Sequence, residues 1–142
     1  MEEFSDSKTT YYNKERWQVN LSKNQAYLGY SIVLLKRECR SLSELSDEEW
    51  SEFHKVVKYL ESKFKEKFDA TMFNWTCLMN DAYKQNPPKP YVHFHFRPRY
   101  RDEVKIGNEI FKDKEFAHHY NKKREKIVSE DVLDEIVKVL KL

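Results

Sequence analysis

The feature that most constrains the fold is a long amphipathic segment that begins at Ser46. Ser46 and Glu49 have the spacing of a capping box, in which the two residues satisfy each other's backbone N–H groups at a helix start. The apolar residues that follow recur at helical spacing: Trp50, Phe53, Val56, Val57, Leu60, Phe64 and Phe68. The sequence therefore predicts one helix from Ser46 to about Phe68. We expect it to pack on an antiparallel sheet through Trp50, Phe53, Val57, Leu60 and Phe64.

Three segments around this helix have the pattern of strands. Apolar and polar residues alternate over residues 17–21, which indicates a half-buried strand. A second strand is predicted from about Tyr27 to Lys36, and a third, rich in aromatic residues, from Met72 to Met79. Residues Asn80 to Pro90 are dense in turn formers and prolines, so they indicate an ordered loop or a crossover.

The two ends of the chain differ in pattern. Residues 1–14 are polar and without periodicity, which predicts a flexible N-terminal arm, and residues 15–142 are expected to form one domain. Its C-terminal extension, about 101–142, contains a last helix that Ser129 can cap. The apolar face of this helix is Val132, Leu133, Ile136, Val137 and Leu140. The predicted class is α+β, with an antiparallel sheet packed against the long helix.

Composition excludes several functional classes. The 26 basic and 24 acidic side chains nearly cancel, so neither a nucleic acid polymer nor a membrane surface is expected as a partner. The two glycines, Gly29 and Gly107, form no glycine-rich phosphate loop, and Cys39 and Cys77 form no zinc or disulfide framework. No run approaches the roughly 18 apolar residues that a membrane helix needs. We therefore expect a cytoplasmic protein.

The segment from Tyr91 to Arg97 is the candidate for chemistry. Because side chains alternate along a strand, the residues of one face are Tyr91, His93, His95 and Arg97, and those of the other are Val92, Phe94 and Phe96. Two imidazoles side by side offer a nucleophile and a hydrogen-bond donor, and an arginine can bind phosphate. Two alternatives stay open: an ordinary strand, or a metal pair whose third ligand would be His54, His118, His119 or a cysteine.

Residues Tyr91 to Arg99 resemble the signature of the histidine triad family, His-φ-His-φ-His-φ-φ, in the form that continues into Pro-Arg. The similarity is to the branch of diadenosine polyphosphate hydrolases and fragile histidine triad proteins. It extends to Gly29, to Lys36-Arg37 and to Met79-Asn80-Asp81, and covers roughly residues 17 to 100. At the first triad position stands Tyr91, and the family's Gly-His pair is Gly29-Tyr30 here.

This resemblance implies a mechanism in which His93 attacks a nucleotide phosphorus and forms a nucleotidyl-histidine. His95 would bond the phosphate oxygens, and Asn80, Tyr91, Arg97 and Arg99 would bind substrate or phosphate. No metal ligand and no cofactor are implied, although magnesium could accompany the nucleotide. A dinucleoside polyphosphate-like substrate and a homodimer are expected.

The replacement at Tyr91 leaves two hypotheses. In the family, the backbone carbonyl of the first triad residue orients the nucleophile, and Tyr91 still supplies a carbonyl. The first hypothesis is therefore a hydrolase or nucleotidyl transferase. The alternative is a catalytically impaired protein with a nucleotide-binding or regulatory role.

Overall fold

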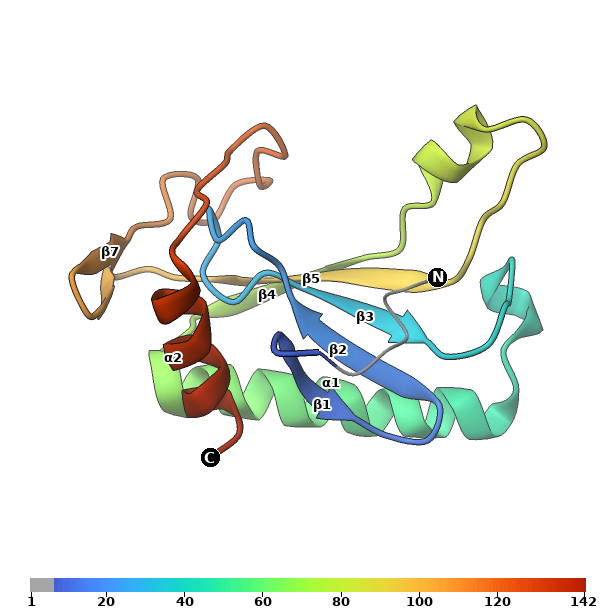
Figure 1. The fold of residues 1–142 in the computed structure, drawn as a ribbon, viewed down its shortest axis with the longest axis horizontal. Coiled ribbons are helices and arrows are strands. Elements are labelled where there is room, and N and C mark those ends of the chain that lie inside the picture. The colour runs from blue at the N-terminus through green and yellow to red at the C-terminus, as the bar shows by residue number, and fades with distance from the viewer. Residues whose placement is uncertain (1–6) are drawn as a thin grey trace.

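The computed structural model describes residues 7–142, which form one antiparallel sheet covered by helices and loops (Figure 1). The strands are β1 (Thr10–Asn13), β2 (Trp17–Leu21), β3 (Ser31–Leu35), β4 (Met72–Thr76), β5 (His93–Arg99), β6 (Val104–Ile106) and β7 (Glu109–Phe111). The helices are η2 (Leu42–Glu44), α1 (Asp47–Phe68), η3 (Asn80–Lys84) and α2 (Glu130–Leu140). The main sheet has the order β1-β2-β3-β5-β4, and β6 and β7 form a separate hairpin. The α+β prediction is confirmed.

Helix α1 begins and ends close to the predicted residues. Both hydrogen bonds of the capping box at Ser46 are present, and the helix stops where Asp69 takes a left-handed conformation with φ 59°. Its buried apolar residues are Val56, Leu60, Phe64 and Phe68. The expected contact of Trp50 is only partial, because 41% of this side chain is exposed where the first turn lies at the margin of the sheet.

The prediction of a flexible arm is wrong for Thr10–Asn13. These residues form β1 and pair with β2, with Thr10 opposite Asn20 and Asn13 opposite Gln18. Tyr11 is buried there, and its hydroxyl is 2.7 Å from the Ser31 hydroxyl. A strand of four residues is too short to show a clear period, so pairing with β2 decides its structure. The first six residues of the predicted arm lie outside the described part of the chain.

Strand β3 begins four residues later than predicted because Gly29 forms a turn before it. Gly29 has φ +89°, and a Cβ atom at this position would overlap the ring of Phe64. Only glycine combines this left-handed conformation with such a close approach of the backbone to α1. The turn ends at Tyr30, which places that side chain at the start of β3.

The C-terminal extension packs on the domain through α2. Ser129 caps this helix as predicted, since its hydroxyl accepts a hydrogen bond from the Val132 N–H. The buried residues of α2 are Leu133, Ile136, Val137 and Leu140. The Tyr59 hydroxyl of α1 donates to the carbonyl of Leu140 at 2.6 Å. Within residues 7–142, none of the helices has the length and apolar character needed to cross a membrane.

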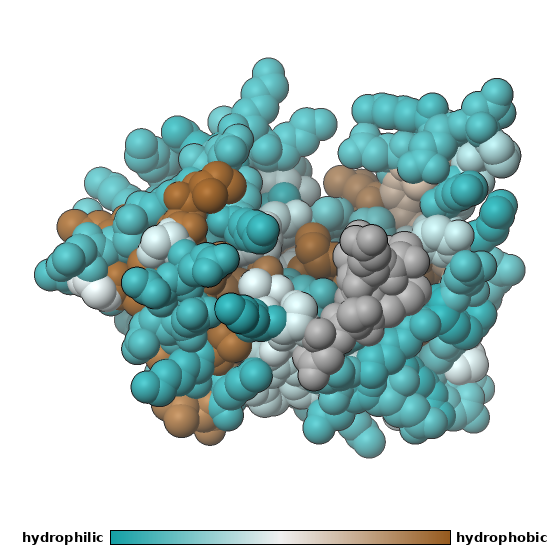
Figure 2. All heavy atoms as spheres, viewed as in Figure 1, coloured by the Kyte–Doolittle hydropathy of each residue, from teal (hydrophilic) through white to brown (hydrophobic). Residues whose placement is uncertain are grey.

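The two faces of the main sheet have different covers. Helix α1 covers one face, while η3 and a loop of residues 112–128 rise above the opposite face (Figure 1). We call residues 112–128 the covering loop. Figure 2 shows that the surface is hollowed between these two raised segments.

Candidate active site

Strand β5 carries two histidines on the face that α1 does not cover. The alternate residues Phe94 and Phe96 point into the core, where their ring centroids lie 4.5 Å from Phe53 and 5.4 Å from Phe64 of α1. His93 and His95 therefore project from the opposite face, with ring centroids 5.0 Å apart. The predicted alternation is confirmed, and hydrophobic packing is what orients the two imidazoles.

The His93 ring is oriented by the backbone of Tyr91. The distance from His93 Nδ1 to the Tyr91 carbonyl oxygen is 2.8 Å. A carbonyl oxygen only accepts, so Nδ1 carries the proton, and in the neutral ring Nε2 presents a lone pair. The Val92 N–H donates to the Cys39 carbonyl at 2.8 Å and holds this part of the chain in place. The arrangement is that of an imidazole prepared for nucleophilic attack.

The His95 ring is bonded to a tyrosine that precedes β3. Its Nδ1 lies 2.6 Å from the Tyr30 hydroxyl, and the two rings are nearly parallel, with an interplanar angle of 14°. Burial, then the neighbouring His93 and Arg97, lower the pKa of His95 to about 4. Burial also raises the pKa of Tyr30, against the opposing effect of Arg97. At neutral pH, His95 is uncharged and Tyr30 keeps its hydroxyl proton.

Arg97 is the next residue on this face and is held between two aromatic rings. Its guanidinium carbon lies 4.1 Å from the centroid of Tyr30 and 3.9 Å from that of Tyr120 in the covering loop. Two aromatic rings at these distances restrain the guanidinium, whose N–H donors lie in the plane of the group. Such an arginine can bind a phosphate oxygen with little further loss of side-chain entropy.

No model of a protein family matches this chain, and no curated protein sequence matches it. Solved structures do match. A hypothetical histidine triad nucleotide-binding protein from Sulfolobus tokodaii is 17% identical, with a TM-score of 0.67, over 94% of this chain and 80% of the other. A histidine triad protein from Marinobacter aquaeolei is 16% identical, with a TM-score of 0.66, over 93% and 86%. The Plasmodium falciparum diadenosine triphosphate hydrolase, solved with cyclomarin A, is 14% identical, with a TM-score of 0.64, over 96% and 76%.

This protein has the histidine triad fold. In the sequence resemblance described above, Tyr91, His93 and His95 align with the three histidine positions of the signature, and Arg97 aligns with an apolar position. The side chain at the first position is thus a phenol, while the carbonyl of the same residue contacts His93.

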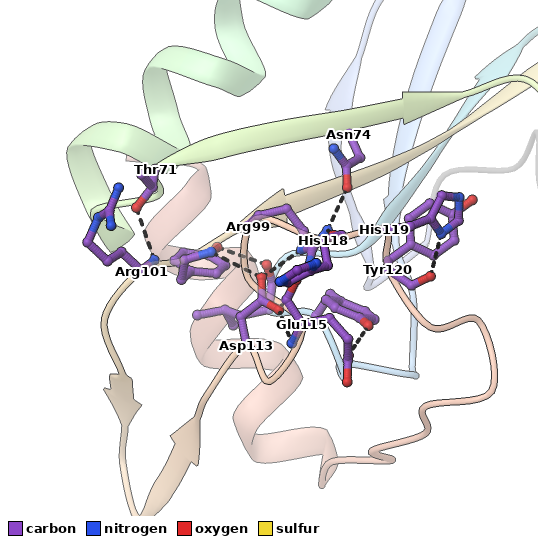
Figure 3. A network of polar contacts seen from close by, with 12 residues as sticks. Thr71, Asn74, Arg99, Arg101, Asp113, Glu115, His118, His119 and Tyr120 are labelled. Carbon is purple, nitrogen blue, oxygen red and sulfur yellow. Dashed lines mark hydrogen bonds and ion pairs between the residues drawn. The ribbon is translucent and has the colours of Figure 1, made fainter.

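The prediction that Arg99 binds phosphate is wrong. Arg99 is fully buried, and its five N–H groups all have partners (Figure 3). Two donate to Asp113 at 2.6 and 3.0 Å, and one NH2 group donates to Asn74 Oδ1 and the His118 carbonyl, each at 2.8 Å. The fifth donates to the Glu115 carbonyl at 2.8 Å. Arginine has five N–H donors, so none is left for a ligand.

The position of the covering loop explains this outcome. Arg99 shares the face of the histidines, because Pro98 does not interrupt β5 and pairs with Phe73 of β4. Residues of the covering loop then fold over the side chain and close it off. Arg99 instead links this loop to the sheet through its hydrogen bonds. The same loop places the Tyr120 ring against the Arg97 guanidinium.

Asn80 is placed on the opposite side of the hollow. It is the first residue of η3 and is exposed. Among the described residues, the hydrogen-bond partners of the two imidazoles are Tyr91 and Tyr30 rather than Asn80. A contact of Asn80 with phosphate stays a prediction. Residues 7–142 contain no group of three His, Cys, Asp or Glu side chains placed to hold a metal, so the third ligand of the metal hypothesis is not found there.

Two site residues were not predicted from the sequence. In the sequence, Tyr30 differs from the histidine of the family's Gly-His pair, and this difference is the signal that points to a partner of His95. Tyr120 had no such signal, because the covering loop lacks periodicity and a single tyrosine in a charged segment is unremarkable by pattern.

Proposed function

We propose that this protein is a nucleotide hydrolase or nucleotidyl transferase that acts on phosphoanhydride bonds through a nucleotidyl-histidine at His93. The observation that carries the proposal is the 2.8 Å contact between His93 Nδ1 and the Tyr91 carbonyl, which leaves Nε2 free to attack. The histidine triad fold and the presence of a diadenosine triphosphate hydrolase among proteins of this fold support it. The substrate we propose is a dinucleoside polyphosphate or a related nucleotide.

The reaction we propose has two displacements at one phosphorus. In the first, the Nε2 lone pair of His93 forms a bond to the α-phosphorus, and the P–O bond to the leaving phosphate breaks with its electron pair. In the second, the oxygen of water or another acceptor attacks the same phosphorus, the P–N bond breaks, and the electron pair returns to Nε2. The positive charge that develops on the ring is stabilised through Nδ1–H by the Tyr91 carbonyl.

The neighbouring residues supply contacts to the phosphates in this proposal. Arg97, restrained by two tyrosine rings, binds non-bridging oxygens, and Asn80 approaches the substrate from η3. No metal is proposed at the nucleophile, and magnesium would enter only with the nucleotide. We also propose a homodimer, because β4 is an edge strand of the main sheet and offers unpaired backbone groups among the described residues. The location we propose is the cytoplasm.

A second candidate is a protein that binds nucleotides without turnover. Tyr91 is the observation that favours it, because the first triad position lacks its imidazole. Both candidates predict nucleotide binding in the hollow above β5, and they differ only in chemistry.

Rapid-quench incubation with a diadenosine polyphosphate labelled at the α-phosphorus separates the candidates. The enzyme proposal predicts label attached to the protein, stable to base and labile to acid as phosphorus on histidine is, together with release of mononucleotide. His93→Ala should lose both while calorimetry still detects binding. Binding without label or release supports the second candidate, and the absence of both binding and turnover contradicts both.

A further inference from the structure

The hydrogen bond between Tyr30 and His95 can run in either direction, and the groups around it favour donation by the hydroxyl. Among the described residues, the acceptor within reach of the Tyr30 hydroxyl is His95 Nδ1, at 2.6 Å. The Arg97 guanidinium lies 4.1 Å from the centroid of the Tyr30 ring, and because a guanidinium only donates, it offers the Tyr30 hydroxyl no alternative acceptor. When the hydroxyl donates to Nδ1, the imidazole proton must be on Nε2.

The surroundings of His95 all favour its neutral form. On β5 it lies between His93 and Arg97, which both disfavour a further positive charge. The residue opposite His95 on β4 is Thr76, which carries no charge. Tyr30, just before β3, contacts the His95 ring itself, whereas Tyr120 of the covering loop contacts Arg97. The ring therefore faces the hollow as an uncharged N–H donor.

We propose that Tyr30 is a positioning residue that holds His95 as the neutral tautomer with its proton on Nε2. We extend this to substrate class: the site acts on nucleotides whose leaving group departs as a phosphate anion, in preference to phosphoramidates, whose leaving group is an amine. The extension rests on the proposed function. The statement about Tyr30 does not, because it concerns the free protein.

The chemistry of the two leaving groups differs in its need for a proton. When a phosphoanhydride P–O bond breaks, the electron pair stays on a phosphate oxygen, which is stable as an anion and needs only a hydrogen bond from His95 Nε2–H and the charge of Arg97. When a phosphoramidate P–N bond breaks, the nitrogen must gain a proton before it leaves. A neutral imidazole is a poor acid, and because burial and the neighbouring His93 and Arg97 lower the pKa of His95 to about 4, its protonated form is scarce at pH 7.

The first test reads the tautomer directly, without any substrate. Long-range ¹H–¹⁵N correlation spectra of histidine-labelled protein should show His95 with Nε2 protonated and Nδ1 unprotonated, assigned by the loss of its signals in His95→Asn. Tyr30→Phe keeps the ring and removes the hydroxyl, so the signals should move toward a mixture of tautomers. Tyr12→Phe is the matched control, because it removes a hydroxyl on β1, where the ring packs on Tyr59. A parent protein with Nδ1 protonated would overturn the positioning role.

The second test compares a diadenosine polyphosphate with adenosine 5′-phosphoramidate. The parent should prefer the anhydride in kcat/KM by at least about 100-fold, since general acid catalysis typically contributes 10² to 10⁴. Tyr30→Phe should lower kcat on the anhydride by about 10- to 100-fold with little change in KM, because the lost hydrogen bond matters mainly in the transition state. Tyr30→His, which restores a polar ring, should recover part of this loss, and Tyr12→Phe should match the parent.

The outcomes separate the two levels of the proposal. A parent that prefers the phosphoramidate would contradict the inferred substrate class, and a Tyr30→Phe variant with the kcat of the parent would show that the positioning of His95 by Tyr30 does not matter for catalysis. A parent that turns over neither substrate contradicts the proposed function, and with it the substrate class. The tautomer spectra decide the role of Tyr30 in every case.

Discussion

Arg97 and Arg99 lie two residues apart on the same face of β5, and the protein uses them in opposite ways. Arg97 lies between two tyrosine rings, which contact the faces of its guanidinium and restrain it beside the histidines. Arg99 has all five donors bonded to groups of the protein and is fully buried. The histidine end of the strand thus faces the hollow, while the Arg99 end is bonded to the protein itself. Two arginines of the same strand parity thus have different surroundings, because the covering loop bonds all the donors of Arg99 that Asn74 leaves, but contacts Arg97 through the ring of Tyr120.

The largest expected effect lies at the histidine end. His93→Ala should reduce nucleotide turnover by on the order of 10⁴ or more, because a covalent route loses its attacking atom. Steady-state kinetics on a dinucleoside polyphosphate measure it. The midpoint of thermal unfolding should stay close to that of the parent, because His93 faces the hollow rather than the core. A variant that keeps more than one hundredth of the parent rate would show that His93 is not the nucleophile.

The second prediction concerns stability at the other end. Arg99→Met should lower the free energy of unfolding by about 3 to 5 kcal/mol, because it leaves the Asp113 carboxylate buried without its partner. The Asp113 side chain is only 2% exposed in the ion pair. Urea titration measures the change. The matched control is Arg97→Met, which should cost little stability and weaken substrate binding instead. Equal losses of stability in the two variants would remove the distinction between the two ends.

The third prediction tests the second imidazole. His95→Ala should lower kcat by roughly 10² to 10³, the usual cost of losing one strong transition-state hydrogen bond. The loss should therefore fall between those of His93→Ala and of Tyr91→Phe. Single-turnover measurements isolate the chemical step. A loss equal to that of His93→Ala would mean that His95 takes part in forming the covalent bond.

The fourth prediction is a pH dependence of stability. Because the folded protein lowers the pKa of His95 from 6.5 to about 4, the unfolded chain binds more protons between these values. The contribution of His95 to stability is therefore intact above pH 6.5 and is lost as pH falls toward 4. Allowing for solvent screening of a partly exposed ring, the loss is about 1 to 2 kcal/mol. The midpoint of urea unfolding should fall more between pH 7 and pH 4.5 in the parent than in the His95→Asn variant. Equal divergence would contradict the lowered pKa.

The smallest effect is expected for Tyr91→Phe. The contact with His93 comes from the backbone carbonyl, which this change leaves in place. Turnover should stay within about threefold of the parent, since only the hydroxyl of Tyr91 is removed. The same kinetic assay as for His93→Ala measures it. If Tyr91→Phe is as damaging as His93→Ala, the hydroxyl has a catalytic role of its own.

The sequence by itself determined the elements whose signals are local. The capping box at Ser46, the apolar stripe of α1 and the alternation along β5 depend on residues within a few positions of one another, so their faces could be predicted. The contact of His93 with Tyr91 also spans only two residues, but it was the resemblance to the histidine triad family that implied it.

The tertiary structure alone decided the contacts between distant residues. The pairing of β3 with β5 brings Tyr30 to His95 across 65 residues, and no periodicity reports which strands are neighbours. The covering loop packs against β5, where it bonds the Arg99 guanidinium but contacts Arg97 through a tyrosine ring, although both arginines lie on the same face of the strand. Such contacts depend on which strands are neighbours in the sheet and on which distant groups satisfy buried hydrogen-bond donors. Short-range sequence patterns contain no information on either.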